Sequence, residues 1–339
     1  MPETVLLTGA SGYIAAHILD AFLGAGFHVR AQVRSKGSEE RVKHHYTKYV
    51  DSGALSFVYV EDISVPGAFD EVVKDVEGVI HTASPFILNA KDYDKDLFDP
   101  ARNGTLSILQ AVKKNNPKVK RIVITSSFAS AIDMSKGLRS GYTYTEADWN
   151  PMTIEEARNA DPTSAYLVSK EIAEHAAYEF EEKEHPNFTV TTLLPPMVYG
   201  PVEHDVSSMS HLNTSAADVY RLMNGSEKSV PETGFYAYAD VRDLAKAHLL
   251  AYTTEAAANQ RYLITNASYT YQMLCDIIRK NFPELKDKTP EGDAGAPFPN
   301  VYHLDNSKSI EELGMTYRTM EESVVDMVKS LLALEKSLT

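Results

Sequence analysis

A short apolar run that breaks at a glycine turn is the feature that most constrains the fold of this chain. Val5-Leu6-Leu7 predicts a strand, and the segment Thr8–Ala15 leads into an amphipathic stretch, Tyr13 to about Leu23, that predicts a helix. Glycines at positions 9 and 12 permit a tight turn and a close approach of the backbone to a pyrophosphate, which the N–H groups at a helix start attract. The pattern is typical of a dinucleotide-binding unit, although a plain strand–helix turn would have the same glycines.

Strands and helices alternate along the first two hundred residues. Val/Ile/Leu-rich runs predict strands at 29–33, 55–60, 79–83, 121–125 and 189–194, with helical patterns that include 99–114 and 164–185. Apolar strands separated by helices indicate a parallel sheet covered on both faces, and right-handed crossovers then give a doubly wound Rossmann fold. We therefore expect an α/β protein. Residues 1–195 would form a dinucleotide-binding domain, with added segments near 236–265, and 196–339 mainly a smaller substrate-binding lobe.

The excess of acidic over basic residues makes some classes of binding partner unlikely. The chain of 339 residues has 33 Lys and Arg against 47 Asp and Glu, a formal net charge of −14. Such a surface repels nucleic-acid phosphates and anionic membranes, so we expect neither as a partner. The single Cys275 leaves no internal disulfide, and no convincing metal-ligand spacing occurs, so no metal is expected.

The hydropathy pattern and the start of the chain bear on location. No apolar run approaches the ~18 residues that a spanning helix needs. Met1-Pro2-Glu3-Thr4 lacks the basic start and apolar stretch of a signal peptide. We therefore expect a cytoplasmic protein.

The end of the second predicted strand indicates the cofactor. A dinucleotide site places there either an acid, which accepts from the ribose 2′-hydroxyl, or an arginine, which accommodates a 2′-phosphate. Arg34 and Lys36 follow this strand, and no acid appears until Glu39. This pattern favours NADPH, with the alternative that both cations are solvated surface charges.

A tyrosine and a lysine carry the expected chemistry. Tyr166 and Lys170 are four residues apart on the helix predicted over 164–185, and so lie on one face. An ammonium favours the tyrosinate, so we expect Lys170 to lower the pKa of Tyr166 and make it a usable general acid or base. Ser127 follows the strand at 121–125; its hydroxyl either hydrogen-bonds a substrate carbonyl or merely ends the strand in a turn.

In this order, the glycine turn, the strand-end serine and the Tyr-x3-Lys pair resemble the extended short-chain dehydrogenase/reductase family over nearly the whole chain. Within it, the sequence is similar to the dihydroflavonol-reductase-like branch and to fungal NADPH-dependent aldehyde and ketone reductases of the methylglyoxal type. The segments that carry the resemblance are Val5–Ala15, His81–Phe86, Thr125–Ser127, Asp148–Pro151, Tyr166–Lys170, Val198–Pro201, His211–Ser215 and Asp240–Asp243.

The resemblance implies hydride transfer from NADPH to aldehydes and ketones, such as ketoesters, diketones and methylglyoxal-like compounds. Ser127 would hydrogen-bond the carbonyl oxygen, Tyr166 would donate the proton, and Lys170 would also hold the nicotinamide ribose. Phe86, Phe128 and Tyr199 are expected to wall the substrate pocket. The residues expected to bind the cofactor are Gly9, Ala10, Ser11, Gly12, Tyr13, Ile14, Arg34, Lys36, Asp62, Ile63, Thr82, Ala83, Ser84, Tyr166, Lys170, Pro195, Val198 and Ser215.

Two departures and two alternative functions stay open. Leu194 stands where the family often has Asn, so a polar contact is lost, and Asn103 could relay protons or support the backbone. One alternative is a nucleotide-sugar epimerase or dehydratase; dehydratases usually carry acids just after the strand-end Thr, where this chain has Ser126-Ser127-Phe128. The other is a non-catalytic NADP-binding redox sensor, although such proteins commonly lose the Tyr or the Lys. The physiological substrate, and whether the protein is a monomer or a homodimer, are left undecided.

Overall fold

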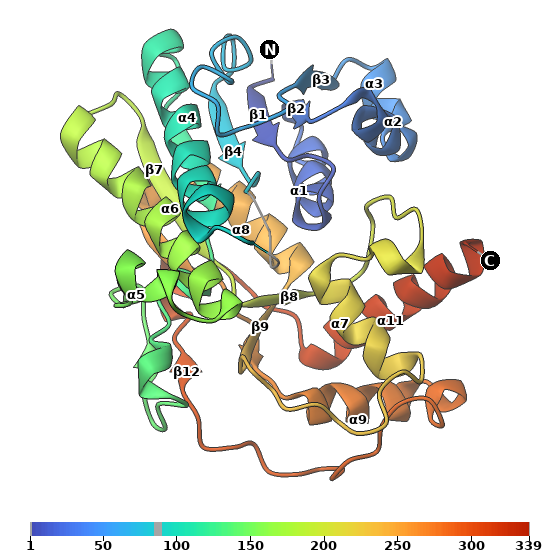
Figure 1. Cartoon of the computed structure of the whole chain (residues 1–339). Helices are drawn as coiled ribbons and strands as arrows, with labels where there is room; N and C mark the ends of the chain where they lie inside the picture. Colours follow the sequence, from blue (N-terminus) through green and yellow to red (C-terminus); the bar gives the residue numbers. More distant parts are fainter. Residues whose placement is uncertain (1, 85–89, 339) are drawn as a thin grey trace.

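The computed structural model describes residues 2–84 and 90–338. Within them, a central sheet of seven strands, all parallel, has the order β10-β7-β5-β4-β1-β2-β3 (Figure 1). The strand order reverses between β1 and β4, and a crevice at the carboxyl ends of such strands is where open α/β sheets bind ligands. The strands are β1 (Thr4–Thr8), β2 (His28–Val33), β3 (Leu55–Tyr59), β4 (Gly78–His81), β5 (Arg121–Thr125), β7 (Thr189–Leu194) and β10 (Arg261–Leu263).

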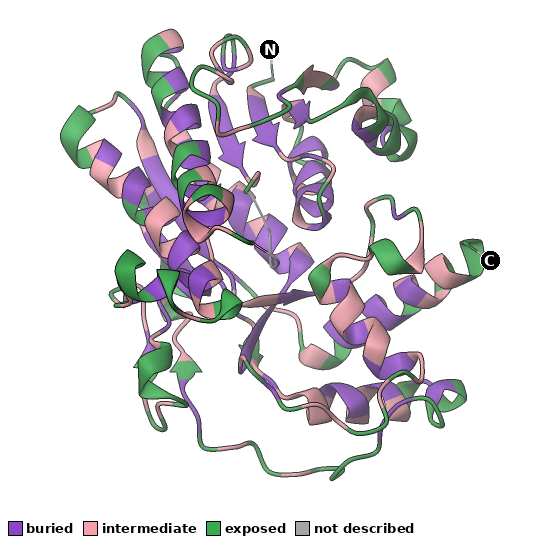
Figure 2. Ribbon diagram, in the orientation of Figure 1, coloured by how far each residue is buried: buried purple, intermediate pink, exposed green. Residues whose placement is uncertain are grey.

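Helices cover both faces of this sheet. α1 (Tyr13–Gly24) and α8 (Val241–Thr253) pack on one face, and α4 (Asp99–Asn115) and α6 (Pro162–Glu184) pack on the other. The alternation along β1 explains this, since Val5 and Leu7 join the core under α1 and α8, whereas Leu6 joins the core under α4 and α6. After β2 come α2 (Lys36–His45) and α3 (Thr47–Asp51). Figure 2 shows the strands, apart from the edge strand β3, buried between the helices.

The second part of the chain forms a smaller lobe with its own core. A three-stranded sheet has the order β11-β9-β8, and three helices pack around apolar residues that include Leu222, Ile278 and Met327. These elements are β8 (Met197–Tyr199), β9 (Ala237–Asp240), β11 (Ala267–Ser268), α7 (Thr214–Met223), α9 (Tyr271–Asn281) and α11 (Met320–Ser337). Smaller elements are the paired β6 (Thr143–Tyr144) and β12 (His303–Leu304), α5 (Ile154–Arg158) and α10 (Ser307–Leu313).

The expected doubly wound α/β fold is confirmed. The strands predicted at 121–125 and 189–194 coincide with β5 and β7. The strand predicted at 79–83 ends at His81, because the N–H groups of Thr82 and Ala83 turn to Thr8 Oγ1, each at 3.1 Å. β10 has only three residues, too few for a periodic signal. The domain division at residue 195 stays a prediction. In the described part of the chain, no helix combines the length and apolar character needed to cross a membrane.

Gly78 provides a test of how closely α8 packs on the sheet. A Cβ atom at Gly78 would lie 2.1 Å from Tyr252 Cε2, whereas a Cβ at Gly24 would meet nothing within 4 Å. Overpacking costs about 1–3 kcal/mol, so Gly78→Ala should lower the free energy of unfolding by that amount in a urea titration. Gly24→Ala, in the last position of α1, is the matched control and should leave stability equal or slightly higher. Equal effects of the two substitutions would contradict the packing.

Candidate active site

A cavity of about 1270 Å³ lies between the carboxyl ends of the strands and the smaller lobe. Its wall is formed by the glycine turn, the residues after β4 and β5, one face of α6, the segment of β8 and the start of α7. Thirteen residues predicted from the sequence line it, so the fold gathers side chains from six separate segments. They are Gly9, Gly12, Tyr13, Ile14, Thr82, Ser84, Ser127, Phe128, Tyr166, Lys170, Pro195, Val198 and Ser215.

Seven of the residues expected to bind the cofactor are not among those that line this cavity. Ile63 and Ala83 line an adjoining space of about 20 Å³, together with Ser84 and Lys170. Ala10 is buried below the turn, Ser11 is half-buried, and Arg34, Lys36 and Asp62 are exposed. The Asp62 carboxylate accepts hydrogen bonds from Ser64, which lower its pKa. Phe86 lies outside the described residues.

Three further expectations concern single residues. Tyr199 does not wall the cavity: it is fully buried, and its hydroxyl donates to Asp218 Oδ2 at 2.7 Å behind the surface. Asn103 is exposed on α4 and lines neither space. Leu194 is fully buried in an apolar cluster with Phe128, so packing replaces the polar contact that the family often has.

The glycine turn is shaped to admit a ligand at the start of α1. Gly9 has a φ of +67°, and a Cβ there would lie 3.1 Å from the backbone of Ala83. Its N–H donates to Gln32 Oε1 at 2.9 Å, and Gln32 Nε2 donates to Val60 O at 2.8 Å, which ties the turn to the ends of β2 and β3. Gly12 begins α1 without a side-chain cap. The N–H groups of this first turn can therefore hold an anion such as a pyrophosphate.

Tyr166 and Lys170 project from α6 into the cavity. Lys170 Nζ lies 5.3 Å from the centre of the Tyr166 ring and donates to Ser84 Oγ at 2.6 Å. Burial lowers the pKa of Lys170 to about 8 and raises the pKa of Tyr166. The expected lowering of the Tyr166 pKa is thus wrong in net direction, because desolvation of the phenol outweighs the ammonium. The phenol stays protonated at neutral pH and is suited to donate a proton.

The strand-end hydroxyls differ in their partners. Ser126 Oγ donates to Glu174 Oε2 at 2.7 Å. His248 Nδ1 lies 2.8 Å from Leu244 O and must donate to it, so His248 Nε2 accepts from Thr125 Oγ1 at 2.7 Å. Ser127 Oγ accepts from Ala129 N at 3.2 Å and lines the cavity, and within the described residues no acceptor takes its proton. Of the three, Ser127 is the one able to donate to a ligand.

Glu174, which the sequence analysis missed, anchors this arrangement. It is buried and accepts from Ser126 and Ser130, from Thr192 Oγ1 at 2.7 Å, and from Arg261 Nε at 2.8 Å. The Arg261 guanidinium in turn lies 3.6 Å from the centre of the Trp149 ring. Tyr166, Lys170 and Glu174 follow one another at four-residue intervals, and this spacing is the signal that could have revealed Glu174.

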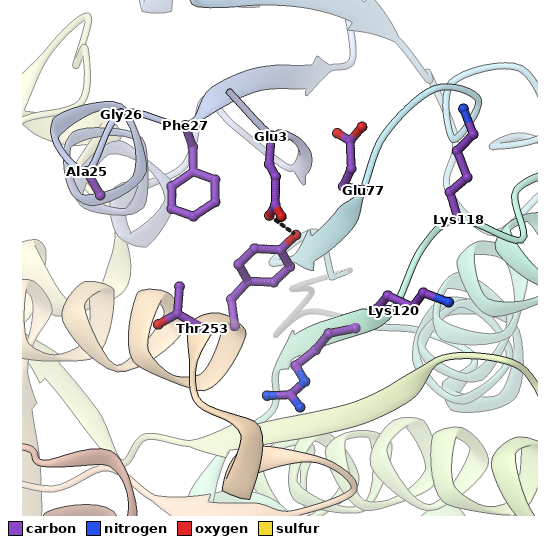
Figure 3. Close-up of a pocket in the computed structure, with 10 residues that line it drawn as sticks. Glu3, Ala25, Gly26, Phe27, Glu77, Lys118, Lys120 and Thr253 are labelled. Atoms are coloured by element: carbon purple, nitrogen blue, oxygen red, sulfur yellow. Dashed lines mark hydrogen bonds between the residues drawn. The ribbon is translucent and has the colours of Figure 1, made fainter. Parts of the chain in front are cut away.

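A second cavity, of about 610 Å³, opens at the opposite edge of the sheet (Figure 3). Glu3, Glu77, Lys118 and Lys120 stand around it, and Tyr252 donates to Glu3 Oε2 at 3.2 Å. This is the amino end of the strands, away from the edge where open α/β sheets bind ligands. Across residues 2–84 and 90–338, no group of three or more His, Cys, Asp or Glu is placed to hold a metal ion.

Comparison with known proteins identifies the class of protein. The model of the NAD dependent epimerase/dehydratase family matches residues 5–265. The chain therefore belongs to this family, the extended short-chain dehydrogenase/reductases, as the sequence led us to expect.

Several of the individual relatives are fungal reductases. The chain is 38% identical to the NADPH-dependent methylglyoxal reductase GRE2 of Saccharomyces cerevisiae, over 98% of this chain and 99% of the relative. It is 37% identical to the ketoreductase azaE of Aspergillus niger, over 98% of both chains. The crystal structure of yeast methylglyoxal/isovaleraldehyde reductase Gre2 complexed with NADPH superposes with a TM-score of 0.92 at 37% identity, covering 98% of this chain and 99% of that one.

The Glu174–Arg261 pair gives a stability prediction. Glu174→Ala leaves the Arg261 guanidinium buried without a counter-charge, which should lower the free energy of unfolding by about 3–5 kcal/mol. The matched control is Glu179→Ala on the same helix, which breaks an exposed pair with Lys183 and should cost under about 1 kcal/mol. Chemical denaturation followed by the fluorescence of Trp149 measures both. A loss of under about 1 kcal/mol in Glu174→Ala would contradict the account.

Proposed function

We propose that this protein is an NADPH-dependent reductase that converts aldehydes and ketones to alcohols. The relatives confirm the expected activity class and cofactor, since one is an NADPH-dependent methylglyoxal reductase, one is a ketoreductase, and one was crystallised with NADPH. The observation that carries the proposal is the joint presence of Ser127, Tyr166 and Lys170 in the cavity that the glycine turn also lines. Ketoesters, diketones and methylglyoxal-like compounds are the proposed substrates.

Each residue has a distinct part in the proposed reaction. When bound, NADPH supplies the hydride. Ser127 donates a hydrogen bond to the carbonyl oxygen, which polarises the bond. Tyr166, kept protonated by burial, donates its phenolic proton to that oxygen as negative charge develops on it. Lys170, held by Ser84, binds the nicotinamide ribose hydroxyls and keeps its ammonium beside the phenol.

The cofactor-binding residues follow from the same proposal. The first turn of α1, after Gly9 and Gly12, would hold the pyrophosphate. Asp62 and Ile63 would flank the adenine, Thr82–Ser84 would line the middle of the cofactor, and Val198 and Ser215 would also contact it. Ala10, Ser11, Tyr13, Ile14 and Pro195 complete the proposed set. The cradle supports this assignment, because a side chain at Gly9 would be strained and would crowd Ala83.

The two alternative functions have specific weaknesses. A dehydratase would need an acid after the strand-end Thr, but Ser126 and Ser127 stand there, and Ser126 is already bonded to Glu174. A redox sensor would not need the Tyr166–Lys170 pair. An assay of NADPH consumption with a simple diketone and with a nucleotide sugar separates the three functions.

We also propose that the protein acts in the cytoplasm on small molecules, without nucleic-acid or membrane partners. The net charge of −14 supports this, because it disfavours binding to anionic polymers and membrane surfaces. Cell fractionation tests the location. The assembly, monomer or homodimer, is a question for sedimentation.

Tyr166→Phe tests the mechanism. The substitution keeps the ring and removes the proton, so kcat should fall by ~10²-fold or more while NADPH still binds. Tyr178→Phe is the matched control: it removes a phenol on the same helix, where it bonds Thr192 away from the cavity, and should leave kcat close to the wild-type value. Near-native turnover by Tyr166→Phe would eliminate the mechanism.

Arg34→Ala tests the choice of cofactor. Arg34 is exposed just after β2, where its guanidinium can bind the 2′-phosphate through two N–H groups. Lys36, the first residue of α2, has a supporting role. A charge-assisted contact is worth ~1.5–3 kcal/mol, so the KM for NADPH should rise roughly tenfold to a hundredfold, with NADH nearly unchanged. Arg34→Lys should give an intermediate KM. Equal use of NADH and NADPH by the unmodified enzyme would refute the assignment.

A further inference from the structure

One helix of the smaller lobe forms a continuous wall of the cavity. Along α7, residues Thr214, Ser215, Ala217, Asp218 and Arg221 all line it. A helix rises 1.5 Å per residue, so Arg221 lies about 9 Å further along the axis than Ser215. Because Ser215 is a proposed cofactor contact, it lies at the cofactor end of the cavity. Arg221 then lies towards the opposite end of the cavity, beyond the position proposed for the reacting carbonyl.

At that end, a cluster of polar side chains is already ordered by its own hydrogen bonds. Asp218 accepts from Tyr199 at 2.7 Å, from Tyr271 at 2.9 Å, and from Arg221 through Nε at 3.0 Å and Nη2 at 2.9 Å. Arg221 Nη1 donates to Glu227 Oε1 at 2.6 Å. We call Asp218, Arg221 and Tyr271 the polar wall, with Tyr199 as its support from behind.

In the polar wall, Arg221 still has N–H groups that can donate to a ligand, whereas the Asp218 carboxylate is already occupied by donors. The Asp218 carboxylate is nearly buried, with 11% of its side chain exposed, and it is surrounded by donors. Arg221 is 33% exposed, and its contacts with Asp218 and Glu227 use three of its five N–H groups. Although burial opposes its charge, the bonds to Glu227 and Asp218 hold the pKa of Arg221 above its ordinary value, so it is a permanent donor.

Negative charge nevertheless predominates around this guanidinium. Asp218 and Glu227 both pair with Arg221. Glu232 also lines the cavity, next to Thr233, whose Oγ1 accepts from Tyr271 N at 3.0 Å. Two carboxylates therefore pair with a single cation, and a third carboxylate lines the same cavity. A neutral acceptor can bond the guanidinium without charge repulsion, but a carboxylate must approach against net negative charge.

We propose that Arg221 determines specificity at the far end of the substrate. The enzyme would prefer uncharged carbonyl compounds that carry a second hydrogen-bond acceptor, such as an ester, and would discriminate against the corresponding carboxylates. This inference rests on the proposed carbonyl reduction and adds to it a substrate class and a residue that selects it.

Three matched ketones test the proposal by kcat/KM at saturating NADPH. They are ethyl 4-oxopentanoate, 2-octanone, which has the same chain length without the ester, and the 4-oxopentanoate anion. We expect kcat/KM to decrease from the ester to 2-octanone to the anion, and kcat/KM for the anion to be about tenfold or more below that for the ester. Arg221→Met should lower kcat/KM for the ester roughly tenfold or more, towards that of the ketone, and leave 2-octanone nearly unchanged.

Further variants separate charge from packing. Lys228→Met also replaces a cation with methionine, but at an exposed position outside the cavity. The ratio of kcat/KM for the ester to that for the ketone should stay at the wild-type value. Glu232→Gln should raise kcat/KM for the anion several-fold relative to the ester, and added salt should do the same in the wild type. Arg221→Lys keeps the charge but loses the fork, and should give an ester-to-ketone ratio between those of the wild type and Arg221→Met.

Two results would overturn the proposal. In one, Arg221→Met lowers kcat/KM for the ester and for 2-octanone equally, which would make Arg221 a packing residue. In the other, the wild type reduces the anion and the ester with equal kcat/KM. A small aliphatic aldehyde, too short to reach the polar wall, distinguishes failure of the parent proposal: if neither it nor any ketone is reduced, carbonyl reduction itself is wrong.

Discussion

Parallel pairing of every strand in the central sheet is the constraint on which the site depends. Because all seven strands run in the same direction within the described chain, their carboxyl ends meet at one edge. Thr8 at the end of β1, and Ser84 and Ser127 after β4 and β5, lie far apart in sequence but are brought to that edge. The smaller lobe then closes the edge with α7, and the cavity belongs to both parts. The opposite edge carries the mixed-charge cavity of Figure 3.

Helix α6 couples the sheet to the chemistry. Three successive positions on one of its faces have three tasks: Tyr166 and Lys170 enter the cavity, and Glu174 holds the serine next to Ser127. The buried pair of Glu174 with Arg261 fixes α6 against β10, and the hydrogen bond to Ser126 fixes it against β5. A shift of α6 would therefore disturb the proton donor and the strand-end hydroxyls together. Rigid support of this kind is what a site that must position a carbonyl requires.

Local patterns predicted much of this, and long-range contacts account for what they missed. The glycine turn, the strand periodicity and the four-residue spacing of Tyr166 and Lys170 are visible within a few neighbouring residues. The pairing of Glu174 with Arg261 joins positions 87 residues apart and leaves no local trace. The sequence pattern around an aromatic residue such as Tyr199 is the same whether its side chain lines a cavity or lies behind the cavity wall. The direction of the Tyr166 pKa shift differs from the expectation for a related reason, since desolvation depends on tertiary burial that spacing does not reveal.

The central claim is that the Tyr166 phenol, whose pKa burial raises, is the acid for carbonyl reduction. The direct measurement is kcat against pH in both directions, with saturating NADPH and ketone, and with saturating NADP+ and the alcohol product. A raised pKa leaves the phenol protonated throughout the neutral range. The account therefore predicts that kcat for reduction stays level between about pH 6 and 7.5, below the Lys170 pKa of about 8, whereas kcat for oxidation, which needs the phenolate, rises with pH. A reduction rate that already fell about tenfold per pH unit between about pH 6 and 7.5, where Lys170 is still charged, would mean that the phenol ionises there, and would contradict the account.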